Sequence, residues 1–337
     1  ILQEALEIII LMLSPIVPHF CHVLWNHLGH EGAVMDASWP IPIEEALTQD
    51  TIVIVLQVNG KLRDRIEVSE DTSKEELEQT ENTQPALMAV SIAICRIIEY
   101  ESGKKIDQIA YAVCGHSLGE YSALCSVNSL SLFDTTKLLK QRGIAMQNAV
   151  DFNKAKMSAV LGLDILEIDK IIKNQNKKSI CEVANDNCPG QVVLSGLKKD
   201  VDEVTTLCLK KGAKKIIDLN VSAPFHCSLM KKASEIMEKE LKEVILEVPK
   251  INFLCNYNAQ CIKDRNKIKE FLVKQVTARV RWRETLVNLH NLGVGKIVEI
   301  GAGKVLTGLS KRMKLNFENS SIETMIEIEQ FIEGLIK

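Results

Sequence analysis

A glycine–serine–glycine turn is the first place in this sequence where the residue types suggest chemistry. Gly115-His-Ser117-Leu-Gly119 follows a short run of small apolar residues and precedes a run with helical periodicity. On a tight strand–turn–helix, such a serine projects its hydroxyl above the end of a sheet, and the glycines avoid a Cβ clash. The alternative is an ordinary turn that needed two glycines. The rest of the chain must therefore supply a base, an oxyanion site and a substrate anchor.

The chain offers seven histidines as a possible base for Ser117, and four of them lie within the first thirty residues. His116 is adjacent to the serine, so its side chain should point elsewhere. His290 lies in a helical run, where a packing or surface role is expected. His226 lies in "VSAPFHCSLM", a loop after a predicted strand, and catalytic residues favour loops on rigid scaffolds. A histidine activates serine by accepting its proton. Spacing alone leaves His226 open between a base and a structural histidine.

The elements after residue 79 indicate an α/β fold with an insertion. A helix is expected from near Pro85, a short apolar strand before Gly115, and a long helix with Asp134 as its N-cap. Residues 156–221 have the order strand, helix, hairpin, helix, strand, which is typical of a ferredoxin-like subdomain. The chain then returns to strand–helix alternation. "GAGKV" at 301–305 lacks the full phosphate-loop spacing, so it predicts a strand-to-helix turn.

The first part of the chain predicts two helices and a hairpin. Leu2 to Leu13 has helical periodicity, a second helix runs from Pro18 to Gly29, and Asn59-Gly60 between two β-rich runs signals a hairpin. A capping box at Ser73–Glu76 would open a further helix. One group suggests a metal site by composition: His19, Cys21, His22, His27 and His30. Proline and glycine interrupt its spacing, so we interpret these residues as surface and helix-end side chains.

Composition and charge are those of a globular protein made of two unlike parts. Apolar residues make up 46% and charged residues 25% of the 337 residues. Residues 1–79 contain four basic and fourteen acidic side chains, a net charge of −10, whereas the whole chain carries only −3. Ten isolated cysteines, with no secretory signal and no apolar run long enough for a membrane, predict reduced thiols in a cytoplasmic protein. The chain begins with Ile1, so we expect an internal fragment or an incomplete reading frame.

The second part resembles the malonyl-CoA:acyl-carrier-protein transacylases over about 260 residues. The motifs that carry the resemblance occur in family order: "TQPAL", "GHSLGEYSAL", "QRGIAMQNAV", "MSAVLGL", "NDNCPGQVVLSG", "VSAPFHCSLM", "LVKQVTARVRW" and "VEIGAGKVLTGLSKRM". The implied fold is an α/β-hydrolase-like acyltransferase core with an inserted ferredoxin-like subdomain, preceded by a small helical and β-hairpin fragment. The implied divisions are 1–78 for that fragment, 79–155 and 221–320 for the core, 156–220 for the subdomain and 321–337 for a C-terminal helix.

The resemblance also implies roles for individual residues. Ser117 would be the nucleophile, His226 its base, and Gln275 the residue that orients the histidine through its main-chain carbonyl. The backbone N–H of Leu118 would be an oxyanion donor at a helix N-terminus. Arg142 would pair with the malonyl carboxylate, because a planar guanidinium binds a carboxylate bidentately. The implied substrate-binding set is completed by Asn185, Asn187 and His116. From the residues alone, Arg142 and Gln275 could instead be a solvated arginine and a surface amide.

Residues 1 to about 76 resemble the C-terminal end of bacterial leucyl-tRNA synthetases. The matching stretches are "LSPIVPHFCHVLWNHLGHEG", "SWP" and "IVLQVNGKLRDRIEV". The transacylases begin with a strand and a Gly-Gln-Gly-Ser-Gln loop that supplies a second oxyanion donor, and we find no such loop here. The chain therefore looks like a splice of two gene fragments near "KEELEQT". Because losing one oxyanion donor costs about 10²–10³ in rate, we hypothesise an impaired enzyme.

Three functions follow as hypotheses. The first is a transacylase that moves malonyl from malonyl-CoA to acyl carrier protein through a Ser117 ester, as a monomer, with no cofactor, no metal and no membrane. The second is a tRNA-binding appendage formed by residues 1–76, which the −10 charge disfavours because phosphate binding needs Lys and Arg. The third is a non-catalytic chimeric relic that at most binds coenzyme A or carrier protein.

Overall fold

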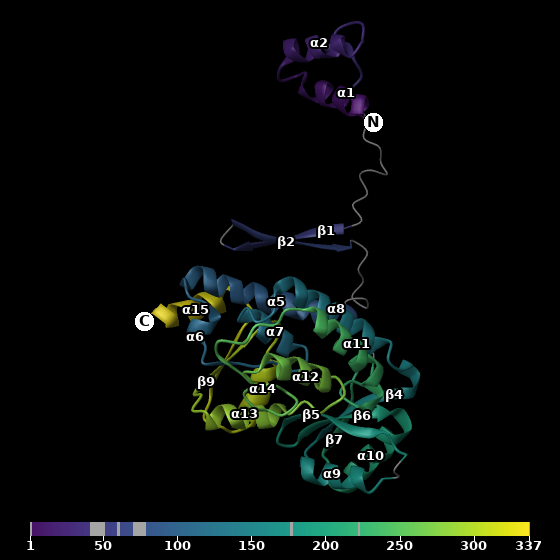
Figure 1. Cartoon of the computed structure of the whole chain (residues 1–337), viewed down its shortest axis with the longest axis vertical. Coiled ribbons are helices and arrows are strands. Elements are labelled where there is room, and N and C mark those ends of the chain that lie inside the picture. Colours follow the sequence, from purple (N-terminus) through teal and green to yellow (C-terminus); the bar gives the residue numbers. More distant parts are fainter. Residues whose placement is uncertain are drawn as a thin grey trace. The chain divides into compact units, whose positions relative to one another are not determined.

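The computed structural model describes residues 2–40, 51–58, 61–69, 79–175, 178–221 and 223–336. The chain divides into two compact units, Ile1–Thr72 and Ser73–Lys337. The sequence placed this boundary at residue 78, slightly later in the chain. Figure 1 shows the elements of both units. All ten cysteines are free thiols. None of the helices in the described ranges is long and apolar enough to cross a membrane.

Unit 1 contains a small helical cluster and a hairpin. Its elements are α1 (Leu2–Leu13), α2 (Pro18–His27), the 3-10 turn η1 (Val34–Asp36), β1 (Thr51–Val58) and β2 (Lys61–Ser69). The helices bury Cys21 and Trp25, and the His30 ring stacks on Trp25 and hydrogen-bonds Glu7 at 2.9 Å. β1 and β2 pair antiparallel as predicted. The predicted turn at Asn59-Gly60 and the capping box at Ser73–Glu76 lie outside the described residues.

Unit 2 is an α/β domain in two parts. The elements of the core are α5 (Thr80–Ser102), α6 (Ile106–Ile109), β3 (Ala112–Val113), α7 (Gly119–Ser126), α8 (Leu132–Gln147), η3 (Ser228–Met230), α11 (Lys231–Glu243), β8 (Asn252–Phe253), α12 (Arg265–Gln275), α13 (Trp282–Asn291), β9 (Lys296–Ile300), α14 (Val305–Arg312), β10 (Glu318–Ile322) and α15 (Met325–Ile336). β3 pairs parallel with β8, and β9 pairs parallel with β10. The main apolar cluster lies where α5, α7, α8, α11 and α12 pack around β8.

The inserted subdomain has the predicted ferredoxin-like order. Its elements are η2 (Phe152–Lys154), β4 (Ala155–Leu161), α9 (Ile165–Lys173), β5 (Cys181–Cys188), β6 (Gln191–Leu197), α10 (Lys198–Lys210) and β7 (Lys215–Asp218). The four strands form one antiparallel sheet in the order β5-β6-β4-β7. Its own apolar cluster joins β4, β5 and β6 to α9 and α10, the two helices at the lower end of unit 2 in Figure 1.

The start of α5 differs from the prediction. The helix begins at Thr80, so Pro85 lies inside it rather than near its first residue. Pro85 is the sixth residue of this helix, so its missing N–H costs the hydrogen bond that the Glu81 carbonyl would otherwise accept. A tertiary contact holds the extra turn, since Thr80 and Gln84 are buried and Gln84 Oε1 accepts from Arg142 Nη1 at 2.6 Å.

Two further boundaries also correct the sequence prediction. Ser131, not Asp134, is the N-cap of α8: its hydroxyl accepts the Asp134 N–H at 3.0 Å and donates to the Asp134 carboxylate at 2.7 Å. Both residues are good caps, and in a Ser-x-x-Asp box the first of them occupies the cap. At the other end of the chain, the predicted helix 321–337 is preceded by strand β10, and α15 begins only at Met325.

Candidate active site

Ser117 occupies a strained turn between β3 and α7. Its φ is +54°, a left-handed value that is costly for a residue with a side chain. Gly115 makes the turn possible, because a Cβ there would lie 2.0 Å from the Gly119 carbonyl. The Leu118 N–H follows directly at the N-terminus of α7 and has no backbone partner in the part of the chain that the structure describes. It is therefore free to bind an oxyanion, with the helix dipole favouring negative charge.

His226 meets Ser117 from a loop more than one hundred residues further along the chain. The Ser117 hydroxyl hydrogen-bonds His226 Nε2 at 2.8 Å, and Nδ1 hydrogen-bonds the main-chain carbonyl of Gln275 at 2.8 Å. A carbonyl can only accept, so Nδ1 carries the proton and Nε2 presents its lone pair to the serine. Burial, together with the smaller effect of the nearby Arg142 charge, lowers the pKa of His226 to about 3. The imidazole is therefore neutral at pH 7, as a general base must be.

Arg142 is the third group at the serine. Its guanidinium is 1% exposed and donates from Nη2 to Ser117 Oγ at 3.0 Å and to Gln275 Oε1 at 2.8 Å. Nη1 donates to Gln84 Oε1 at 2.6 Å, whereas Nε has no hydrogen-bond partner among the described residues. All these partners are neutral. Arginine stays protonated even when burial lowers its pKa, so the site holds a fixed positive charge beside the nucleophile.

The remaining predicted site residues lie around this centre. His116 turns away from the serine and hydrogen-bonds Asn187 Oδ1 through Nε2 at 2.9 Å, and burial lowers the pKa of its ring. Asn187 and Asn185 are both buried in β5 of the inserted subdomain. Asn185 also forms a backbone bridge with Val280, which joins the subdomain to the core. The structure therefore brings Ser117, His226, Arg142 and Gln275 together, places His116 and Asn187 beside them, and links Asn185 to none of them by a side-chain hydrogen bond.

Comparison with known proteins agrees with this geometry. The acyl transferase domain family matches residues 41–325. Among curated proteins, the malonyl CoA-acyl carrier protein transacylase of Haemophilus influenzae is 38% identical over 263 residues, which cover 78% of this chain and 83% of the relative. The same enzyme of Bacillus subtilis is 37% identical over 262 residues, or 77% and 81% of the two chains. The chain belongs to the malonyl-CoA:acyl-carrier-protein transacylase family.

Solved structures extend the likeness to three dimensions. The acyl-carrier-protein-S-malonyltransferase of Bartonella henselae has a TM-score of 0.76 and 41% identity, covering 79% of this chain and 85% of its own. A malonyl-transacylase solved in complex with a type II PKS acyl-carrier protein has a TM-score of 0.75 and 35% identity over the same shares. The anticodon-binding domain of tRNA ligases matches residues 1–79. The acyl transferase match starts at residue 41, so it includes β1 and β2, which the sequence analysis assigned to the first part alone.

Sequence reasoning missed three residues that hold this transacylase site together: Gln84, Glu120 and Asn256. Asn256 Oδ1 accepts the Ser117 N–H at 2.7 Å, and its Nδ2 donates to the Gly115 carbonyl at 2.7 Å. Glu120 accepts the Asn256 N–H at 2.7 Å and the side-chain amide of Gln275. Burial raises the pKa of Glu120 to about 8. One signal was available: Asn256 follows the buried strand β8 as Ser117 follows β3, and in parallel sheets such carboxyl ends meet at one edge.

The described residues offer this site no metal centre. No group of three or more His, Cys, Asp or Glu side chains in the described ranges lies close enough to hold an ion.

We predict that Asn256→Ala destabilises the fold and loosens the serine turn. The change removes the partners of the Ser117 N–H and the Gly115 carbonyl, and each buried polar group left without a partner costs about 1–3 kcal/mol. We therefore expect urea unfolding to show a loss of about 2–4 kcal/mol. The matched control is Asn258→Ala in the same loop. Among the described residues, the Asn258 side chain accepts only a local bond from the Gln260 N–H, so its loss should stay below about 1 kcal/mol. Equal losses in the two variants would contradict the bracing role of Asn256.

Proposed function

We propose that this chain transfers a malonyl group from malonyl-CoA to the phosphopantetheine thiol of acyl carrier protein, the malonyl-loading step of fatty acid synthesis. The observation that carries the proposal is the convergence of two groups on one oxygen. His226 Nε2 lies 2.8 Å and Arg142 Nη2 3.0 Å from Ser117 Oγ. A base and a fixed cation at one nucleophile suit the acylation of serine by an anionic acyl group.

The first half-reaction forms a seryl ester. Ser117 Oγ attacks the thioester carbonyl carbon while its proton passes to His226 Nε2, and the carbonyl electron pair moves onto oxygen. The Leu118 N–H stabilises that oxyanion. When the tetrahedral intermediate collapses, the carbon–sulfur bond breaks and coenzyme A leaves as a thiol with the proton from His226. The second half-reaction runs the same steps in reverse order, with the carrier thiol as the attacking group.

Arg142 gives the site its preference for malonyl. It contacts no carboxylate within the described structure, because its hydrogen-bond partners are two amides and a hydroxyl. Its Nε is buried and unpartnered, so one donor remains for a substrate. A malonyl carboxylate would supply the missing negative charge, whereas a neutral acetyl group would leave the cation unpaired. His226 already has its carbonyl partner at Gln275, so the proposed mechanism needs no aspartate behind the histidine.

We further infer that residues 1–79 derive from a leucyl-tRNA synthetase rather than from another tRNA ligase. The support is the run of stretches quoted above, since the domain match itself names only an anticodon-binding domain of tRNA ligase. We propose that this part binds no tRNA by itself, because its net charge is −10. Filter binding with leucine tRNA tests this, and retention of the tRNA at physiological salt would contradict it. A monomeric chain in the cytoplasm remains our expectation.

We predict that the chain forms a covalent malonyl ester on Ser117. After incubation with malonyl-CoA, intact-mass measurement should show the addition of one malonyl group, and Ser117→Ala should abolish it. Ser122→Ala is the matched control, since Ser122 lies on α7 close to the turn but makes no hydrogen bond to Ser117 or His226 in the described structure. Loss of the adduct in both variants, or its survival in Ser117→Ala, would refute the assignment. Absence of any adduct in the unaltered chain would leave the relic hypothesis in its place.

We predict that Arg142→Lys lowers malonyl loading more than acetyl loading. A hydrogen bond to a charged group contributes about 1.5–3 kcal/mol, so the ratio of malonyl to acetyl ester should fall about 10- to 100-fold. Competition between malonyl-CoA and acetyl-CoA, read by mass, measures this ratio within one sample and so corrects for partial unfolding. Lys140→Ala, on the exposed side of the same helix, should leave the ratio unchanged. An unchanged ratio in Arg142→Lys would remove the arginine from substrate selection.

We predict that acylation loses little rate between pH 7 and pH 5. The folded pKa of His226 lies near 3, below the ordinary 6.5, so the neutral base persists as the pH falls and is lost only near the lowered value. A histidine with the ordinary pKa would lose about 25-fold of its neutral form over the same range. Single-turnover loading by rapid quench measures the rate of ester formation directly. An acid limb centred near pH 6.5 would contradict the burial effect.

A further inference from the structure

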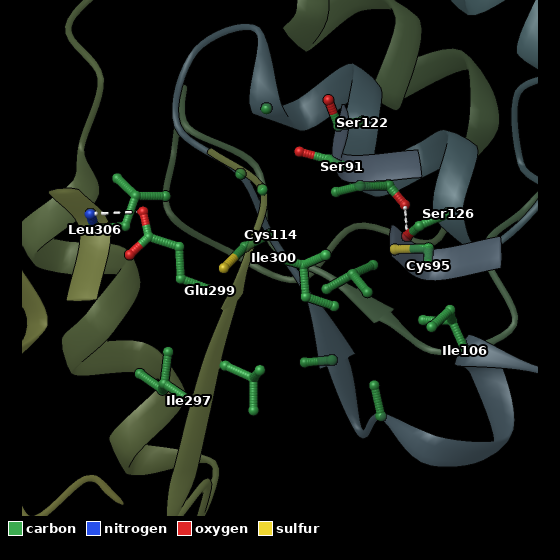
Figure 2. Close-up of a pocket in the computed structure, with 18 of the residues that line it drawn as sticks. Ser91, Cys95, Ile106, Cys114, Ser122, Ser126, Ile297, Glu299, Ile300 and Leu306 are labelled. Carbon is green, nitrogen blue, oxygen red and sulfur yellow. Dashed lines mark hydrogen bonds between the residues drawn. The ribbon is translucent and has the colours of Figure 1, made fainter. Parts of the chain in front are cut away.

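The core contains a deep cavity that the mechanism does not use. It has a volume of about 980 Å³ and is lined by β3 on one side, by β9 on the other, and by α5, α7, α13, α14 and α15 around them. We call it the β3–β9 slot. Figure 2 shows Cys114, which follows β3, Ile297 and Ile300 of β9, and Ser91 and Cys95 of α5 among the residues that line it. The slot lies within unit 2, and β3 and β9 belong to separate two-stranded sheets.

Both strands turn unpaired backbone groups toward the slot. The Tyr111 and Val113 carbonyls accept hydrogen bonds from β8. Alternate residues of a parallel strand direct their backbone groups to opposite sides, so the N–H and carbonyl of Ala112 point away from β8. On β9, the Gly295 carbonyl and the Gly301 N–H bond to β10. By the same alternation, Lys296, Val298 and Ile300 direct their N–H and carbonyl groups away from β10. Within the described ranges, the backbone groups of these residues have no hydrogen-bond partner outside the β3–β8 and β9–β10 ladders. Two such edges are a template for one more strand.

The size of the slot fits one strand. A strand residue rises about 3.3 Å, neighbouring strands lie about 4.8 Å apart and packed layers about 10 Å apart, which gives about 160 Å³ per residue. The cavity of about 980 Å³ therefore has room for about six residues. β3 ends at Val113 and β9 at Ile300, each before a turn and a helix, so an added strand would run parallel to both.

The two faces of the slot determine the chemistry of its occupant. Ala112, Cys114 and Ile297 belong to the apolar cluster with α13 and α14, whereas Val113, Val298 and Ile300 belong to the cluster with α5, α6 and α15. A strand between them would be buried on both faces, and such strands are apolar throughout. Lysine and glutamate line the slot only at Lys296 and Glu299. Lys296 pairs with Glu318 at 2.7 Å, and Glu299 accepts the N–H groups of Leu306 and Thr307. Both of these charged side chains are therefore already engaged by groups of the core.

We propose that the β3–β9 slot is an acceptor for one parallel strand of about six residues, apolar on both faces and supplied by a separate polypeptide. Its main-chain groups would bond to Ala112 and Cys114 on one side and to Lys296, Val298 and Ile300 on the other. The side chains would alternate between the two clusters. Backbone pairing gives such a strand its affinity, and the apolar pockets select its sequence. The proposal is independent of acyl transfer, because it rests on the sheet edges and the cavity alone.

The test uses the full chain and a fluorescent peptide, acetyl-Lys-Lys-Val-Ile-Val-Val-Ile-Val-Gly-amide. The two lysines keep it in solution, and the apolar run is the strand. Fluorescence anisotropy should show saturable binding, and hydrogen exchange should slow in the segments 109–118 and 294–302. The matched probe has the same side chains but N-methyl groups on alternate apolar residues, so it fits an apolar groove but cannot pair with an edge. Equal binding of the two probes would overturn the strand assignment.

A variant of the acceptor completes the design. Ser91 lies over the slot on α5, close to Gly301, so Ser91→Trp fills the slot from one face. We expect peptide affinity to fall at least about tenfold in this variant. Ser91→Ala is the control and should bind as the unaltered chain does. Two outcomes besides equal probe binding would also overturn the proposal. One is protection of both segments in the chain alone, and the other is protection that appears only as the chain dimerises.

Discussion

The active site depends on a buried guanidinium that has no carboxylate hydrogen-bond partner among the described residues. Arg142 is 1% exposed, and its hydrogen bonds go to Gln84, Gln275 and Ser117. Moving a cation out of water costs several kcal/mol even after the protein relaxes, so these neutral acceptors must compensate for much of that cost. Glu120 is also buried, but its carboxyl accepts from Asn256 and Gln275 rather than from the guanidinium, and burial raises its pKa to about 8. The site is therefore electropositive before any substrate binds, and an anionic acyl group is the ligand that this charge selects.

Gln275 joins the cation to the base. Its main-chain carbonyl accepts the His226 Nδ1 proton, its side-chain oxygen accepts from Arg142, and its amide donates to the Ser117 carbonyl at 3.0 Å. Ser117 and His226 both have φ values near +55° to +60°, which cost about 1–3 kcal/mol each unless the surroundings hold them. Gln275 is a single buried residue that hydrogen-bonds all three groups, so it can hold both backbones in place. The substrate anchor, the nucleophile and the base are therefore connected through one residue, although they are far apart in the sequence.

Most helices and strands of this fold could be predicted from the local sequence pattern. Their exact first and last residues could be predicted less well. The inserted subdomain followed from the order of its strands and helices, because each amphipathic run was long and distinct. The start of α5 did not, since the rule for Pro85 was overridden by the burial of Gln84 against Arg142. β10 was missed because its sequence, Glu-Asn-Ser-Ser-Ile, has little β-propensity and is a strand only by pairing with β9.

The same distinction applies within the site. Ser117 and His226 stand in recognisable motifs, and the resemblance proposed Arg142 and Gln275 as their companions. Glu120 and Asn256 carry no such signature, because their roles exist only once β3 and β8 lie side by side. A glutamate in "GEYSAL" is ordinary on a solvated helix. That this one is fully buried became evident only from the packing of α7 against the core.

The position of the nucleophile is fixed from one side of its strand. β3 is two residues long and pairs only with β8 in the described structure. Asn256, at the end of β8, then continues that pairing with its side chain by bonding the Ser117 N–H and the Gly115 carbonyl. On the opposite side, Ala112 and Cys114 face the β3–β9 slot. The catalytic turn keeps its geometry because the Asn256 side-chain amide bonds its backbone beyond the last backbone hydrogen bond between β3 and β8. Contacts on the β8 side of β3 are therefore sufficient to hold the serine.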